Sequence, residues 1–181
     1  MTTDTFDSYR LDVIRRRPND SEIFQLCRIG DTGAVKRLLD RGEASIYDVD
    51  EYEESLLHIA VCYSDPELCQ MLLARGADVY LRNTLRLPID NAMMLNRSES
   101  FISLCEIGGY DLWPLDGSFA LKPYKICDNI SMWRYMFQVN PGTSVREDLF
   151  EKAKWSIRKT MDVKLVEFLV PRFTIKTGIQ R

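Results

Sequence analysis

Histidine, long apolar runs and an excess of one charge are nearly absent from this sequence. The 181 residues include one histidine, and the formal net charge is only −3. Such a balance gives no overall attraction to nucleic acid or to an anionic membrane surface. No apolar run approaches the roughly 18 residues of a membrane-spanning helix, and the first residues lack a basic segment followed by a hydrophobic one. We therefore expect neither a membrane span nor a signal peptide.

The motifs of several enzyme classes are also missing. The sequence has no GxSxG nucleophile elbow, no GxxxxGK[ST] phosphate loop and no GxGxxG after a strand pattern. The paired acids Asp50-Glu51 and Glu53-Glu54 do not have the spacing of a calcium-binding EF-hand loop, so a solvated acidic face is the better interpretation. We predict no enzymatic activity, no cofactor and no metal.

His58 is the one histidine, and Cys62 follows it by four residues, which places both on one face of a helix. The pair could be half of a zinc site or a Cys–His nucleophile pair. Zinc needs two further ligands, and no CxxC, second histidine or HExxH spacing supplies them. A structural role for His58 is the stronger interpretation.

The cysteines are five in number, and most of them fall within apolar helical patterns. An odd number of cysteines in such positions indicates reduced thiols. Since reduced thiols are typical of reducing compartments, we expect an intracellular protein in the cytoplasm or nucleus.

Two short amphipathic helical patterns and their end signals lie together in residues 50–80. In the first pattern, Ser55 is an N-cap candidate in front of apolar residues at helical spacing, which are Leu57, Ala60 and Val61. The second pattern begins at Pro66 and ends at Gly76, a residue that terminates a helix at low cost. Two helices of about ten residues cannot bury their apolar faces alone, so this unit requires neighbours.

Two stretches of this unit are similar to the motif of a known repeat family. Ser55–Ala60 reads SLLHIA and Leu72–Asp78 reads LLARGAD. The unit resembles an ankyrin repeat, whose consensus opens the first helix with Thr-Pro-Leu-His-x-Ala and closes the second with Leu-Leu-x-x-Gly-Ala-Asp. Leu56 replaces the proline of the motif, and Ser64 replaces the glycine usually found between the helices. The resemblance implies that His58 bonds to neighbouring backbone across the stack and that the protein recognises other proteins.

The unit recurs on both sides. The segment from Ser21 aligns Gly42 with Gly76, a shift of 34 residues, and the segment after Tyr80 aligns Gly108 with Gly76, a shift of 32. These shifts bracket the ankyrin period of about 33 residues. In the third unit Asp90 replaces the histidine, and we expect this change to weaken the local hydrogen-bond pattern.

These observations predict an all-α, ankyrin-like solenoid of stacked helix-turn-helix repeats with short β-hairpin fingers. A short leading helix can form in the N-terminal segment 1–20, with the run Arg15–Arg17 as its solvated end. The ankyrin repeat domain covers 21–172 and a tail covers 173–181. Its predicted repeats are 21–49, 50–81 and 82–112, followed by divergent repeats at 113–145, with an aromatic helix around Trp133, and at 146–172, where Pro171 stops the second helix.

Finger tips and the exposed side of the first helices are where we predict contact with a partner protein. Tyrosine and tryptophan are enriched at interface hot spots, and the acidic first finger favours a partner with a basic docking segment. The alternative is that the tyrosines pack finger on finger. The predicted contact residues are Tyr47, Asp50, Glu51, Tyr52, Glu53, Glu54, Tyr63, Tyr80, Arg82, Met94, Tyr110 and Trp113. The predicted structural residues are Ser55, His58, Ala60, Gly76, Pro88 and Gly108.

Two other functions remain open from the sequence. The repeats could regulate or target a larger enzyme whose catalytic domain lies outside this chain. Residues 146–181, with nine basic and five acidic side chains, could contact nucleic acid.

Overall fold

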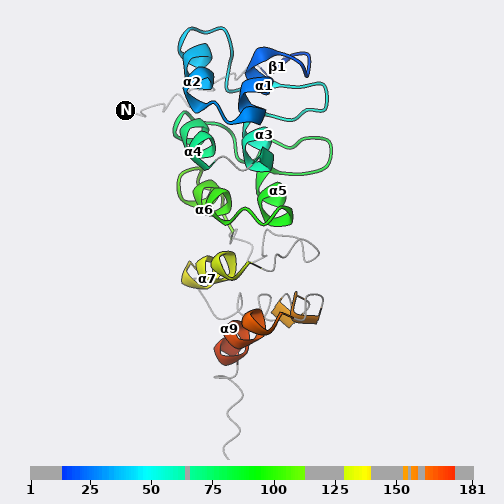
Figure 1. The fold of residues 1–181 in the computed structure, drawn as a ribbon, viewed down its shortest axis with the longest axis vertical. Coiled ribbons are helices and arrows are strands. Elements are labelled where there is room, and N and C mark those ends of the chain that lie inside the picture. The colour runs from blue at the N-terminus through cyan, green and yellow to red at the C-terminus, as the bar shows by residue number, and fades with distance from the viewer. Residues whose placement is uncertain are drawn as a thin grey trace, which may run out of the picture.

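Short helices, most of them arranged in pairs, make up most of the described part of the chain. The computed structural model describes residues 14–63, 66–112, 129–139, 153–154, 156–158 and 162–173. The first three pairs are α1 (Glu22–Ile29) with α2 (Thr32–Asp40), α3 (Leu56–Tyr63) with α4 (Pro66–Ala74), and α5 (Pro88–Met94) with α6 (Ser98–Glu106). They stack in one column, with α1, α3 and α5 in one layer and α2, α4 and α6 in the other (Figure 1). The predicted all-α solenoid is confirmed.

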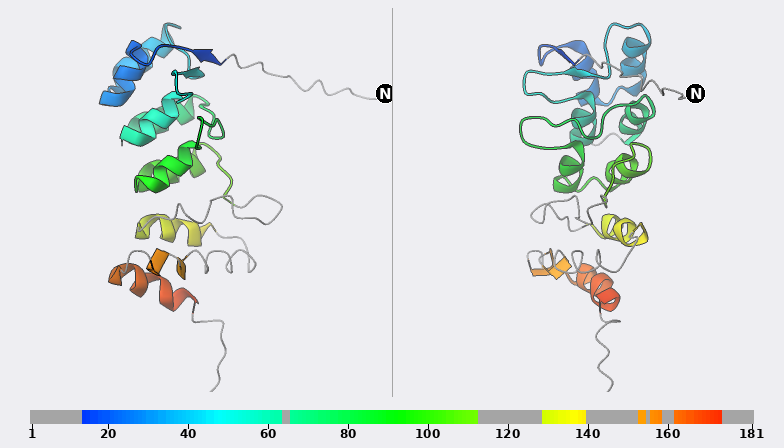
Figure 2. Two further views of the ribbon diagram at one scale, coloured as in Figure 1. Left: turned by 90° about the vertical axis from the view of Figure 1, so that its right-hand side faces the viewer. Right: turned by 180° about the vertical axis from the view of Figure 1, so that it is seen from behind.

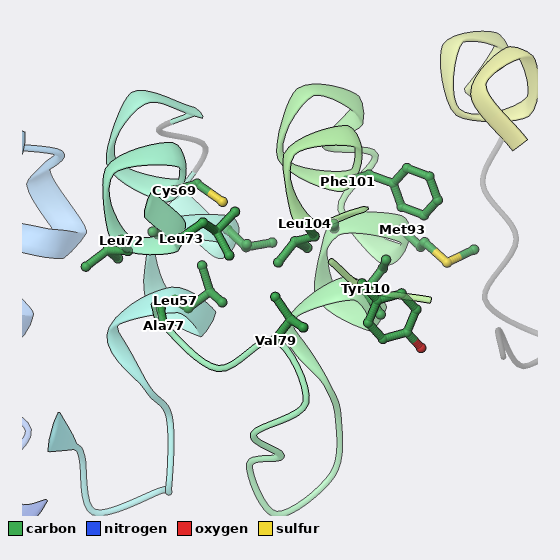
Figure 3. Close-up of a cluster of buried hydrophobic side chains, with 14 of the residues drawn as sticks. Leu57, Cys69, Leu72, Leu73, Ala77, Val79, Met93, Phe101, Leu104 and Tyr110 are labelled. Atoms are coloured by element: carbon green, nitrogen blue, oxygen red, sulfur yellow. The ribbon is translucent and has the colours of Figure 1, made fainter. Parts of the chain in front are cut away.

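The middle helices show why these pairs need one another. All six residues from Leu56 to Val61 in α3 are buried, which is more than one helical face can account for. They are covered because α3 packs against α1, α4 and α5. Figure 3 shows Leu73 of α4 and Leu104 of α6 pointing toward each other, with Val79 of the connecting loop beside them. The apolar core therefore runs continuously from one repeat into the next.

The N-terminal arginine run is a strand, not the end of a helix. Strand β1 (Arg15–Arg16) pairs in parallel with β2 (Asp48–Val49), and the Arg17 N–H donates to the Val49 carbonyl at 2.9 Å. The expectation that Arg15–Arg17 form the end of a leading helix is therefore wrong, and residues 1–13, where the rest of that helix was expected, lie outside the described residues. The reason is long-range pairing, since the arginines find acidic partners more than 30 residues further along the chain.

The last described helices continue the column below α6, as Figures 1 and 2 show. Helix α7 (Ile130–Gln138) packs against α6, and the Phe137 ring lies 6.4 Å from that of Phe168 in α9 (Val163–Phe173). Pro171 lies inside α9 and does not stop it. Because Pro171 is near the C-terminal end, it removes one backbone hydrogen bond and leaves the earlier turns intact. No helix in the described part of the chain is long and apolar enough to cross a membrane.

Glycines end the second helices, but the third repeat has one extra residue at this point. Gly42 and Gly76 adopt the left-handed conformation, with φ of 71° and 84°. In the third repeat the left-handed residue is Gly109, with φ of 69°, so the alignment of Gly108 with Gly76 as the terminating residue is wrong. Gly108 serves close packing instead, because a Cβ there would lie 2.4 Å from Val79 Cγ1 and 2.9 Å from Leu73 Cδ2.

Replacing Gly108 by alanine should therefore destabilise the stack. We expect Gly108→Ala to lower the free energy of unfolding by about 1–3 kcal/mol, because the new methyl group overpacks the contact between the second and third repeats. The measurement is urea denaturation followed by circular dichroism.

Gly33→Ala is the matched control, because a Cβ at this position in α2 meets atoms only at ordinary distances, 3.5 Å from Arg37 and 3.6 Å from Asp31. It should stabilise the protein by about 0.5–1 kcal/mol through helix propensity. Equal effects of the two substitutions would show that Gly108 is not tightly packed.

Candidate functional site

The loops between helix pairs protrude on the side of α1, α3 and α5 (Figure 1). We call residues 48–55 the first finger and residues 78–87 the second finger. In the first finger, Asp50 donates its N–H to the Glu54 carbonyl, and its Oδ1 accepts the N–H groups of Tyr52 and Glu54 at 2.8 and 2.9 Å. Asp50 is fully buried, so the expectation that it is exposed to a partner is wrong. Its carboxylate is needed to hold the turn.

Arginines of the N-terminal strand compensate much of the acidity of the first finger. Arg15 donates two hydrogen bonds to the buried carboxylate of Asp48, from Nε at 2.7 Å and from Nη2 at 3.1 Å. Arg17 Nε forms an ion pair at 2.7 Å with Asp48 Oδ2, the oxygen that also accepts from Arg15 Nη2, and Arg16 donates to Glu53 at 2.8 Å. The finger is therefore less negative than its sequence suggests.

A groove with a volume of about 420 Å³ lies between the two fingers and the helices behind them. The first finger supplies Tyr52 and Glu54, and the second finger supplies residues 83–86. Helix α3 supplies Cys62, α5 supplies Asn91, and Leu95 directly follows α5. Burial and then the charge of Asp50 raise the pKa of Glu54, while Arg28 and a hydrogen bond from Asn83 oppose this shift. The groove thus combines apolar side chains with polar ones, including a half-buried carboxyl group.

Apolar side chains are unusually exposed in this groove. Tyr52 is 62% exposed, Leu85 71% and Leu95 43%. Leu85 and Leu95 were not among the predicted contact residues. The repeat shift of 32 aligns Leu95 with the exposed Tyr63, so the alignment of the repeats could have identified Leu95 as an exposed residue. Large apolar side chains gathered on a rigid surface are typical of interaction sites.

Other predicted contact residues differ in exposure. Tyr63 and Met94 are exposed at the ends of α3 and α5, as is Arg82 on the second finger, whereas Tyr47 is half-buried. Trp113 lies outside the described residues.

Tyr80 and Tyr110 belong to the packing between repeats. Their rings stack with centroids 5.2 Å apart, and the Tyr80 hydroxyl accepts the Asp111 N–H at 2.9 Å. Tyr110 is buried, so its expected exposure is wrong. The alternative that the tyrosines pack finger on finger therefore describes this pair.

His58 joins the second repeat to the second finger. The ring is fully buried, with Nδ1 2.8 Å from Ser55 Oγ and Nε2 3.1 Å from the Arg86 carbonyl. A carbonyl oxygen can only accept a hydrogen bond, so Nε2 carries the hydrogen and donates it to Arg86. In the neutral ring Nδ1 is then the acceptor, and the Ser55 hydroxyl donates to it. Both ring nitrogens are used, and burial lowers the pKa of His58, which keeps the ring neutral.

Cys62 does not form a nucleophile pair with His58. Its Sγ accepts a hydrogen bond from Asn91 Nδ2 at 3.4 Å, and burial, followed by the charge of Glu54, raises the pKa of Cys62 to about 11. The thiol is therefore protonated at neutral pH and a weak nucleophile. Within the described residues, no group of three or more His, Cys, Asp and Glu side chains could hold a metal ion.

Asp90, which takes the position of His58 in the third repeat, keeps part of its role. Its Oδ2 accepts the N–H of Leu87, the residue before α5, at 3.0 Å. At this bond a carboxylate replaces the imidazole as acceptor for the residue three positions earlier.

His58 should make the stability of the protein depend on pH. Its folded-state pKa lies below the ordinary value of 6.5, so the unfolded chain binds the proton more readily. Its contribution is complete above that ordinary value and is lost as the pH falls below it. We expect His58→Gln to cost about 1–3 kcal/mol near pH 7.5 and less near pH 5.

Urea denaturation of both proteins across this range measures the difference. A gap that widens toward low pH would mean that the imidazole is charged in the folded state.

Comparison with known proteins agrees with this geometry. A family model described as "Ankyrin repeat" matches residues 52–84, a segment that runs from the first finger through α3 and α4 into the second finger. Ankyrin repeats generally mediate protein–protein interaction, and domains built from them are typically non-catalytic. The segment 52–84 is thus identified as an ankyrin repeat, and stacked helix pairs of the same kind lie on both sides of it.

Proposed function

We propose that this protein binds a segment of a partner protein in the groove between the first and second fingers, without chemical change to either. The observation that supports this function best is the exposure of Tyr52, Leu85 and Leu95 on three separate elements around one groove. Burying such side chains at a complex is favourable, and a few well-packed residues, among which tyrosine is enriched, contribute most of the binding energy at many interfaces.

The groove is held in shape by buried hydrogen bonds, which reduces the entropy lost on binding. Asp50 fixes the turn of the first finger, and His58 fixes the second finger through the Arg86 carbonyl. A rigid surface loses little conformational freedom when a partner docks, so more of the contact energy becomes affinity.

The expectation that the partner carries basic side chains now depends on two acidic residues of this protein. Asp48 and Glu53 are paired with arginines, and Asp50 is buried inside the turn. Glu51, which is exposed, and Glu54, which lines the groove, make no ion pair with another described residue. A basic side chain of the partner would meet these two carboxylates.

Substitutions in the groove should weaken binding of the partner without lowering the stability of the protein. With the partner identified by affinity capture, we expect Tyr52→Ala and Leu85→Ala to speed its dissociation about tenfold each, the equivalent of about 1.4 kcal/mol. Their melting temperatures should stay close to that of the original protein, because both side chains are exposed. Surface plasmon resonance and melting curves on the same variants make the measurement.

Two control variants keep this test specific. Lys36→Ala changes an exposed side chain of α2, away from the groove, and should leave binding unchanged. Tyr80→Ala removes the stacking on Tyr110 and should lower the melting temperature first. Original dissociation rates for both groove variants would contradict the proposed function.

A further inference from the structure

The charges left uncompensated on the two fingers have opposite signs. On the first finger they are the carboxylates of Glu51 and Glu54, and on the second finger they are the guanidinium groups of Arg82 and Arg86. None of these four side chains makes an ion pair with another residue in the part of the chain that the structure describes. Glu54 and Arg86 line the groove itself, so its two walls differ in charge along the direction of the stack, and Glu51 and Arg82 are exposed on the same two fingers.

The N-terminal strand limits the free negative charge of the first finger to two carboxylates. Without β1, the buried carboxylate of Asp48 and the carboxylate of Glu53 would add to the negative charge of the finger. Arg15 and Arg16 pair with these two groups, so Glu51 and Glu54 remain to attract a partner. A basic residue of a partner could reach Asp48 only by displacing the arginines.

The positive wall is fixed by its backbone. The Arg86 carbonyl lies 3.1 Å from His58 Nε2 and also accepts the N–H of Asn83 at 3.0 Å. These bonds hold the main chain of the second finger while the Arg86 side chain lines the groove. The positions of the two charged walls are thus set by the fold.

We propose that this order of charges selects a partner segment with basic side chains toward the first finger, acidic side chains toward the second finger and an apolar residue between them. This inference rests on the proposed function of the groove. The opposite orientation would bring like charges together at both fingers, and such juxtaposition excludes wrong partners and wrong registers. The segment therefore lies along the stack in one direction.

The test uses a phage-displayed library of linear peptides of about twelve residues, long enough in extended form to span both fingers. Selection on the whole protein should enrich peptides with a basic cluster and an acidic cluster on either side of an apolar residue. The best peptide is then compared with a charge-exchanged version, in which basic and acidic residues trade places and the apolar residues are kept. Fluorescence anisotropy at low salt should show about tenfold weaker binding of the exchanged peptide.

A double variant of the protein should reverse this preference. Glu51→Arg with Arg82→Glu keeps the net charge and changes two exposed side chains without described ion pairs, so the fold should persist. It should bind the exchanged peptide better than the original one. The control Lys36→Glu with Glu67→Lys makes the same exchange on α2 and α4 and should keep the original preference.

The outcomes separate the two proposals. If both peptides bind equally well to the original protein while Leu85→Ala and Leu95→Ala still weaken them, the groove is the site and the inference about charge order is wrong. If neither substitution weakens any selected peptide, the groove itself is the wrong site. A library that yields no enriched peptide contradicts both.

Discussion

The need of short helices for neighbours determines this structure. Helices of seven to nine residues have too little surface to be stable alone, and α3 is buried along six consecutive residues because three other helices cover it. Each repeat thus takes much of its stability from the repeats before and after it. The same stacking places successive fingers side by side, so the groove between them is a direct result of how the core is buried.

Hydrogen bonds of buried polar groups fix the conformation of the fingers and so define the surface that they form. His58 joins α3 to the second finger, and Asp50 satisfies two N–H groups inside the first finger. A polar group buried without its partner would be costly, so each of these bonds favours one arrangement of the finger. The Arg15–Asp48 pair similarly fixes β1 against β2. The surface that we propose for binding is therefore held by interactions that lie beneath it.

Local sequence patterns predicted the fold, but they could not predict contacts between residues that lie far apart in the sequence. The apolar spacing, Ser55 and Gly76 reveal the helices and their ends because these signals act within one turn. Nothing local shows that Arg15 reaches Asp48, or that Gly108 must leave room for Val79. The candidate site was predicted in part: Tyr52 and Glu54 do line the groove, but Asp50 was misplaced, because its exposure depends on the tight turn of the finger.

Hydrogen–deuterium exchange on the complex with a captured partner tests the central claim most directly, since it locates the bound segment on the surface. If the partner lies between the fingers, amides of residues 51–54 and 83–86 should exchange more slowly in the complex, while those of α2 keep their rates. Protection confined to α2, α4 and α6, with both fingers unchanged, would contradict the account and place the interface on the opposite layer of the stack.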